Sequence, residues 1–199
     1  MYEIGREEVE AISKIIKSGK LFRYFENSEC SVFEKKYAKY LSIKNVALAS
    51  SGTTSITAAL VGLKIGPGDE VLIPAHTYMA TAMSVLAVGA IPVIVDIDES
   101  LTIDPKALEE SCGAQTRAAI VVHMWGTTCD MNSIMKIAKK KNIFIIEDAC
   151  QGVGGGYEGK KLGTIGHVGA FSFNYYKNMT SGEGGAVVCN NDKIIERAR

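Results

Sequence analysis

The sequence has no excess of charge of either sign: 22 Lys and Arg balance 22 Asp and Glu in 199 residues. Proteins that bind nucleic acid or anionic membranes through their overall charge carry a basic face or stripe, so we expect neither partner. Disorder is excluded as well. Hydrophobic residues make up 47% of the chain and charged residues 22%, which is the composition of a globular protein.

The five cysteines are odd in number and never occur in C-x-x-C spacing, a pattern typical of a reduced, cytoplasmic protein. The first ten residues hold four glutamates and one arginine, so they lack the basic and apolar regions of a signal peptide. The stretch Pro74–Val95 has no charged residue. It contains His76, Gly89 and two prolines and ends in a β-branched strand pattern, so we do not expect it to span a membrane.

Short apolar segments alternate with helix-sized segments from Asn45 onward. Repeated strand, helix, strand units with strands apolar on both sides predict an α/β fold: a mostly parallel seven-stranded sheet with helices on both faces. The expected strands are Val46–Ala49, Glu70–Ile73, Pro92–Ile97, Ala118–His123, Ile143–Glu147, Gly169–Phe173 and Ala186–Cys189. The expected helices between and after them are Thr54–Leu63, Met79–Val88, Pro105–Ser111, Ser133–Lys141 and Lys193–Arg199.

Two amphipathic helices are predicted before the sheet, at Arg6–Ser18 and Ser31–Leu41, from apolar residues at helical spacing. No repeat, low-complexity tract or Pro/Ser-rich linker divides the chain. We therefore predict an N-terminal helical arm at residues 1–44 and a large domain at residues 45–199.

The loop Ser51–Thr54 joins the first predicted strand to a helix. Free backbone N–H groups, hydroxyls and the positive end of the helix dipole meet there, as a phosphate site requires. Ser and Thr also cap helices that bind nothing, and that alternative stays open.

Asp148 follows the apolar run Ile143–Ile146, so its carboxylate is expected at the mouth of a central strand with a cation nearby. It could instead cap the next helix or pair with a neighbouring basic side chain. Parallel strands end at the same edge of a sheet. The segments Ser50–Thr54 and Glu147–Gln151, together with Ser172 and Lys177, are therefore expected at one rim.

Lys177 stands between aromatic residues and a glycine-rich segment, Gly182–Gly185. Most lysines are solvated surface charges. Here aromatic neighbours could desolvate the ammonium and make it a nucleophile able to form a Schiff base, and the glycines permit close approach of a ligand. A phosphate cradle, an acid for a ring nitrogen, a hydroxyl and a lysine are together the parts that hold pyridoxal phosphate.

Seven ordered motifs resemble those of the DegT-type sugar aminotransferases, a pyridoxal phosphate-dependent family of fold type I. They are S-S-G-T-T at 50–54, G-P-G-D-E-V at 66–71, P-A-H-T-Y-M-A-T at 74–81, G-A-I-P-V-I-V-D-I-D at 89–98, V-H-M-W-G at 122–126, E-D-A-C-Q at 147–151 and F-S-F-x-x-x-K-N-x-T-x-G-E-G-G at 171–185. The resemblance covers essentially the whole chain.

The resemblance implies a role for each matching residue. Lys177 would form the Schiff base with the cofactor, and Asp148 would hold the pyridinium nitrogen protonated. The remaining cofactor residues would be Gly52 and Thr53 with the Ser172 hydroxyl at the phosphate, Gln151 at the phenolic oxygen and Tyr78 stacked on the ring. Tyr78 could instead be an ordinary core tyrosine.

The family resemblance further implies a homodimer and a ping-pong transfer of an amino group from an amino acid, usually glutamate, to a keto-sugar, usually nucleotide-linked. A sister group with histidine in place of the lysine performs dehydration, and Lys177 argues against that chemistry. The rival interpretation is a non-catalytic cofactor-binding or regulatory module of the same fold.

The sequence departs from the family at two positions: Asn174 stands where His is common, and His167 stands where Asp is common. Asn174 puts the sugar-side contacts in doubt, whereas His167 is expected to be a surface change. Family members are about twice as long, so we interpret the chain as truncated before a smaller C-terminal domain, which could leave it inactive.

Metal chemistry is not expected, because His76, His123 and His167 lack ligand spacing. His123 could border the cavity, although a histidine with satisfied hydrogen bonds is the preferred interpretation. Trp125 could border the sugar or pack in the core.

Overall fold

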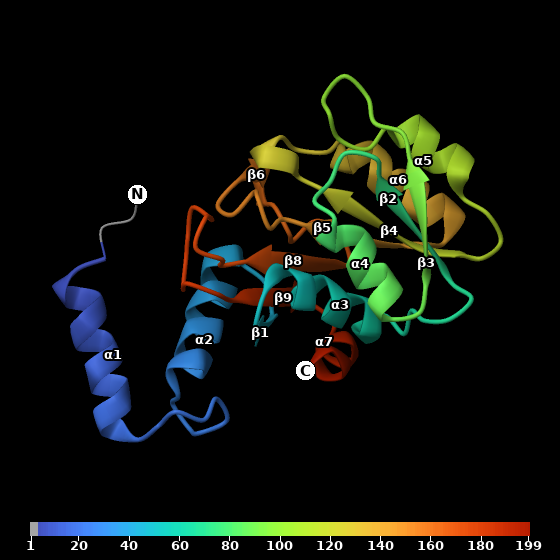
Figure 1. Cartoon of the computed structure of the whole chain (residues 1–199). Helices are drawn as coiled ribbons and strands as arrows, with labels where there is room; N and C mark the ends of the chain where they lie inside the picture. The colour runs from blue at the N-terminus through green and yellow to red at the C-terminus, as the bar shows by residue number, and fades with distance from the viewer. Residues whose placement is uncertain (1–3) are drawn as a thin grey trace.

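The computed structural model describes residues 4–199; Met1–Glu3, part of the segment that argued against a signal peptide, lie outside this range. Its centre is a seven-stranded sheet with the order β1-β9-β8-β5-β4-β2-β3 (Figure 1). Strands β8, β5, β4, β2 and β3 run parallel, and β9 lies antiparallel between β1 and β8. The strands are β1 (Asn45–Ala49), β2 (Glu70–Pro74), β3 (Ile91–Val95), β4 (Thr116–Val122), β5 (Phe144–Asp148), β8 (Val168–Ser172) and β9 (Gly185–Cys189).

Helices cover both faces of the sheet. One face packs against α3 (Gly52–Gly62), α4 (Ala80–Ala87) and α7 (Asp192–Ala198); the other packs against α2 (Glu29–Leu41), α5 (Pro105–Ser111) and α6 (Met131–Lys141). Because both faces of the sheet are covered, a central strand needs apolar residues along its whole length. In strand β4, Ala118 and Ile120 pack toward α3, while Ala119 and Val121 pack toward α6. Burial on both sides of a central strand is the general property of parallel sheets.

The predicted α/β class, the seven strands and the helices on both faces are confirmed. Most predicted ends shift by one or two residues. Helix α3 begins at Gly52 rather than Thr54, because the Ser51 hydroxyl caps it by accepting the N–H of Thr54 at 3.1 Å. Two further elements were not predicted from the sequence: a two-stranded hairpin of β6 (Gly156–Tyr157) and β7 (Lys160–Lys161), and the 3₁₀ turn η1 (Met124–Gly126).

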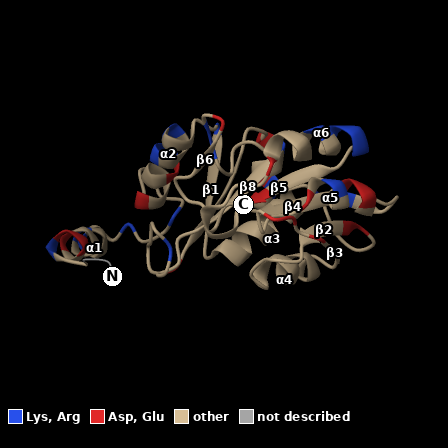
Figure 2. Ribbon diagram, turned by 90° about the horizontal axis from the view of Figure 1, so that it is seen from above, with Lys and Arg blue, Asp and Glu red and all other residues tan. Residues whose placement is uncertain are grey.

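The two N-terminal helices differ in their packing. Helix α1 (Arg6–Ser18) has the predicted bounds and no buried residue, and it stands away from the sheet in both ribbon views (Figures 1 and 2). Helix α2 instead packs on β1, β8 and β9 through Tyr37 and Leu41. The division of the chain at residue 44 stays a prediction.

The uncharged stretch Pro74–Val95 is divided between the end of β2, the eight-residue α4 and β3. Across residues 4–199, no helix combines the length and apolar character needed to cross a bilayer. Within the same range no group of three or more His, Cys, Asp and Glu side chains is placed to hold a metal ion. All five cysteines are unpaired.

Candidate functional site

A cavity of about 450 Å³ opens at the edge of the sheet where β1, β5 and β8 reach their carboxyl ends. This volume is within the range of small-molecule sites. All seven residues predicted to bind the cofactor line it: Gly52, Thr53, Tyr78, Asp148, Gln151, Ser172 and Lys177. The structure therefore brings the predicted residues together, while the role of each one stays a prediction.

The N-terminus of α3 forms one wall of this cavity. The first N–H groups of a helix have no partner inside the helix, and the Ser51 cap engages only that of Thr54. Gly52 is required by close packing: a Cβ there would lie 2.8 Å from both Cys150 Sγ and Ser172 Cβ. Ser51 does cap the helix, as the alternative interpretation held, but the N–H groups of Gly52 and Thr53 remain available for an anion.

Asp148 is the last residue of β5 and is 5% exposed. Its Oδ2 accepts a hydrogen bond from the Thr81 hydroxyl at 3.2 Å, and its Oδ1 accepts one from the N–H of Cys150 at 3.1 Å. The sequence led us to expect a cation beside Asp148. Within residues 4–199, Asp148 forms no ion pair. The side chain of Lys177 lines the same cavity. Asp148 is thus oriented by two neutral donors.

Lys177 lies in the loop that connects β8 to β9. The loop is held by a hydrogen bond from Asn174 Nδ2 to Glu183 Oε1 at 2.7 Å and by one from the N–H of Lys177 to the Asn174 carbonyl at 2.9 Å. No carboxylate in the described part of the chain pairs with Lys177, so its amine is available to a ligand. Tyr176, 88% exposed, lines the cavity together with Lys177.

Tyr78 and Trp125 are both on the surface. Tyr78 is 65% exposed and lines the cavity, which excludes the core interpretation. Trp125 is 74% exposed, so it does not pack in the core either. Its backbone adopts a φ of 52°, which is unfavourable for a bulky residue, and its N–H donates to Gln151 Oε1 at 3.3 Å. Gln151 Nε2 lies 3.5 Å from Met124 Sδ.

Thr81 lines the cavity as well, although it was not predicted as a site residue; it ends the motif that contains Tyr78. Cys150, expected at the rim as part of the segment after β5, also lines the cavity. Burial and the nearby Asp148 carboxylate raise the pKa of Cys150 well above its usual value, although Lys177 opposes this. Cys150 is therefore a neutral thiol that shapes the cavity wall.

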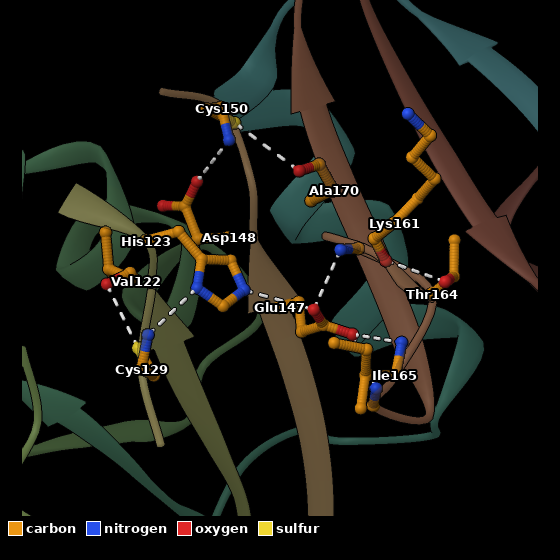
Figure 3. Close-up of polar contacts among 12 residues, drawn as sticks. Val122, His123, Cys129, Glu147, Asp148, Cys150, Lys161, Thr164, Ile165 and Ala170 are labelled. Carbon is orange, nitrogen blue, oxygen red and sulfur yellow. Dashed lines mark hydrogen bonds and ion pairs between the residues drawn. The ribbon is translucent and has the colours of Figure 1, made fainter. Parts of the chain in front are cut away.

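His123 does not border the cavity. It is fully buried on the opposite face of the sheet, where Nε2 lies 3.0 Å from Glu147 Oε2 (Figure 3). This confirms the interpretation of a histidine with satisfied hydrogen bonds. Glu147, next to Asp148 in the sequence, was expected at the same rim, and this was wrong: side chains alternate along β5, so Glu147 points to the opposite face.

His167 lies at the surface, as expected, and it also forms two hydrogen bonds with Ile145 of β5. Its Nδ1 accepts the N–H of Ile145 at 2.9 Å, and its own N–H donates to the Ile145 carbonyl at 2.9 Å. Burial lowers the pKa of His167.

Comparison with known proteins gives consistent results. The family model described as the DegT/DnrJ/EryC1/StrS aminotransferase family matches residues 2–199. The GDP-perosamine synthase of Caulobacter vibrioides is 42% identical over 84% of this chain and 45% of its own length. The X-ray structure of the aminotransferase from Psychrobacter cryohalolentis has a TM-score of 0.94 and 36% identity over 98% of this chain and 50% of its own. The NtdA protein of Bacillus subtilis, with bound cofactor PMP, has a TM-score of 0.87 and 35% identity over 98% and 45%.

The chain spans about half the length of the curated relatives it matches.

Proposed function

The chain belongs to the DegT/DnrJ/EryC1/StrS aminotransferase family, and from this premise we propose that it is the cofactor-binding part of a pyridoxal phosphate-dependent sugar aminotransferase. The amino donor we propose is glutamate, and the acceptor is a keto-sugar linked to a nucleotide. Support for the acceptor comes from GDP-perosamine synthase among the relatives. Support for the cofactor comes from the solved structure with PMP, the amino form of pyridoxal phosphate.

The cavity fits pyridoxal phosphate by the chemistry of its donors. The phosphate suits the N-terminus of α3 and the Ser172 hydroxyl, and the ring nitrogen suits the carboxylate of Asp148. Gly52 leaves the space that a Cβ would fill between Cys150 and Ser172. The single observation that carries the proposal is this convergence of a helix N-terminus, a buried carboxylate and an unpaired lysine in one cavity.

When bound, pyridoxal phosphate supplies an aldehyde that condenses with amines and a pyridine ring that accepts electrons. The Asp148 carboxylate keeps a proton at the ring nitrogen, because a positive charge there is stabilised by the fixed negative charge beside it. Thr81 and the N–H of Cys150 hold that carboxylate in its orientation. Two neutral donors fix its position without cancelling its charge.

Lys177 has two tasks in this proposal. Its Nζ, free of ion pairs with the described carboxylates, would be the nucleophile that holds the cofactor. The same amine would accept and return the proton of the substrate carbon as a general base. The hydrogen bond between Asn174 and Glu183 keeps the lysine loop folded over the cavity.

We further propose that the protein acts as a homodimer. Helix α4 presents an uncharged stripe of Met79, Met83 and Leu86, which are one to two turns apart and all exposed. Helices α3 and α4 contain no charged residue (Figure 2). An exposed apolar face beside a cavity is typical of a protein interface.

The function is tested by a single turnover. The 199-residue chain is loaded with pyridoxal phosphate, mixed with glutamate, and assayed for 2-oxoglutarate and pyridoxamine phosphate. We expect one equivalent of each per bound cofactor, in proportion to the loaded fraction. Binding of the cofactor without formation of either product would contradict amino transfer by these 199 residues and favour a non-catalytic module for this part of the protein.

A further inference from the structure

Glu147 is a carboxylate with no exposed surface, and no Lys or Arg within residues 4–199 forms an ion pair with it. It accepts four hydrogen bonds. Its Oε2 accepts from His123 Nε2 at 3.0 Å and from the N–H of Gly163 at 2.7 Å, and its Oε1 accepts from the N–H groups of Ile165, at 2.6 Å, and Gly166 (Figure 3). A buried carboxylate is tolerated only when its oxygens are satisfied in this way.

His123 supplies the one side-chain donor in this set. Burial of the ring favours its neutral form and opposes the hydrogen bonds to Cys129 and Glu147, which favour the protonated form. The N–H of Cys129 nevertheless points at Nδ1, at 3.3 Å, and this admits only a neutral ring with its proton on Nε2. His123 therefore acts toward Glu147 as a neutral donor of fixed orientation.

The Glu147 hydrogen bonds hold the turn Gly163–Gly166 against β8. The turn lies so close to the strand that a Cβ on Gly169 would sit 2.0 Å from the Gly163 carbonyl oxygen, and a Cβ on Gly163 would sit 2.4 Å from the Phe171 ring. Strand β8 continues from Phe171 directly into Ser172, which lines the cavity. A shift of the turn is therefore passed to the Ser172 hydroxyl through close-packed backbone.

Glu147 is also connected to the cavity through Asp148, the next residue of β5. Residues 147 and 148 point to opposite faces of β5, and the N–H of His123 donates to the Asp148 carbonyl at 3.1 Å. The side chain of His123 thus contacts Glu147, and its backbone N–H contacts Asp148.

We propose that His123 and Glu147 form a positioning pair, which fixes the Asp148 carboxylate and the Ser172 hydroxyl from the face of the sheet opposite the cavity. Neither side chain touches the cavity. Their effect on the ligand passes through Asp148 and Ser172, and the identity of that ligand rests on the proposed function.

The test compares three variants with the wild type. His123→Asn keeps an acceptor for the N–H of Cys129 but is too short to donate to Glu147, whereas His123→Gln places an amide N–H near the former Nε2. Leu108→Ala, in the fully buried core against α6, is the control for general destabilisation. Two quantities are measured: amide hydrogen exchange at Cys150 and Phe173, and the affinity for pyridoxal phosphate.

We expect His123→Asn to speed exchange at both amides and to weaken cofactor binding about ten-fold. This is the scale of the loss in metal affinity when a residue that hydrogen-bonds to a metal ligand is mutated. His123→Gln should recover most of both effects, and Leu108→Ala should change neither amide selectively. If His123→Asn does not fold, Glu147→Asp, which shortens the reach of the carboxylate, replaces it with the same expectations.

Faster exchange confined to Gly163–Gly166, or equal effects of His123→Asn and Leu108→Ala, would overturn the proposal. A wild-type chain that binds no pyridoxal phosphate would instead refute the proposed function. The exchange comparison still decides the positioning role in that case, because it needs no ligand.

Discussion

The chemistry assigned to the cavity depends on the contrast between two charged residues. Asp148 is buried and held by hydrogen bonds from Thr81 and Cys150, so its charge has a fixed place. Lys177 sits on a loop and forms no ion pair with a described carboxylate, so its amine can react and move. In the proposed function, the fixed carboxylate and the mobile amine would contact different parts of one ligand.

Asp148→Asn tests the fixed charge. Asparagine still accepts the N–H of Cys150 and has the same size, so the fold should be kept. Without the carboxylate, the proton at the ring nitrogen loses its stabilisation, and we expect the glutamate half-reaction to slow about 100-fold or more. Stopped-flow absorbance measures the rate. The control is Asp96→Asn, which removes an exposed carboxylate; equal rates in the two variants would refute the role of Asp148.

Gly52→Ala tests the space at the phosphate end. The added Cβ would lie 2.8 Å from Cys150 Sγ and Ser172 Cβ, so the wall of the cavity must shift. We expect affinity for pyridoxal phosphate to fall about ten-fold or more, since displacement of anion-binding N–H groups costs both hydrogen bonds and dipole interaction. The matched control is Gly66→Ala, whose Cβ would meet its nearest atom at 3.7 Å. Unchanged affinity in Gly52→Ala, measured by titration, would contradict the assignment.

Strand β5 and its turn show how an element serves the site on one face and the fold on the other. Ile146 packs toward α3 and Ile145 toward α6. The next two residues continue the alternation: the Glu147 side chain accepts a hydrogen bond from the turn at Gly163, and Asp148 lines the cavity. The period of two in a strand dictates this division.

His167, at the start of β8, gives this region a pH dependence. Burial lowers its pKa from the ordinary 6.5, and Nδ1 can accept the N–H of Ile145 only when unprotonated. The unfolded chain therefore binds the proton more readily. The stabilisation should be complete above about pH 6.5 and should diminish as the pH falls below it.

His167→Asp keeps an acceptor for the Ile145 N–H and removes the imidazole, so it is the matched control for this effect. Urea denaturation at about pH 7 and pH 5.5 measures the free energy of unfolding in both proteins. We expect a larger loss in the wild type than in His167→Asp between these values. Equal losses would show that another group is responsible.

The order of elements could be predicted from the sequence because apolar periodicity and turn residues are local signals. Both β-branched strands such as Ile143–Glu147 and amphipathic helices such as Ser133–Lys141 were found within two residues. The seven residues predicted to bind the cofactor could be placed at the cavity because each follows a strand or belongs to a motif. What could not be predicted depends on long-range packing: the β6–β7 hairpin, the partners of Asp148, and the four hydrogen bonds of Glu147.

Apolar side chains are exposed on several parts of the described chain. They include the α4 stripe of Met79, Met83 and Leu86, the α1 residues Val9, Ile12 and Ile16, and the segment after α1 with Leu21, Phe22 and Phe25. Acidic and basic residues both occur on helices α1, α2 and α5 (Figure 2). The proposed homodimer assigns the α4 stripe, which adjoins the cavity at Tyr78, to the partner copy.

Met83→Glu tests this assignment. A charge in the centre of an apolar contact must be desolvated on association, so we expect the dimer dissociation constant to rise about ten-fold or more. Sedimentation velocity over a range of concentrations measures it. Lys106→Glu, on the far helix α5, is the control and should leave association unchanged. A wild-type chain that stays monomeric throughout, or a Met83→Glu variant that associates equally well, would refute the interface.

The most direct test of the account is covalent trapping of the cofactor. Pyridoxal phosphate is added to the 199-residue chain, the C=N bond to the amine is reduced with borohydride, and the modified peptide is identified by mass spectrometry. We predict one phosphopyridoxyl group per chain, on Nζ of Lys177, with none in Lys177→Ala and full labelling in Lys136→Ala. Absence of an adduct, or one spread over other lysines and retained in Lys177→Ala, would contradict the central claim.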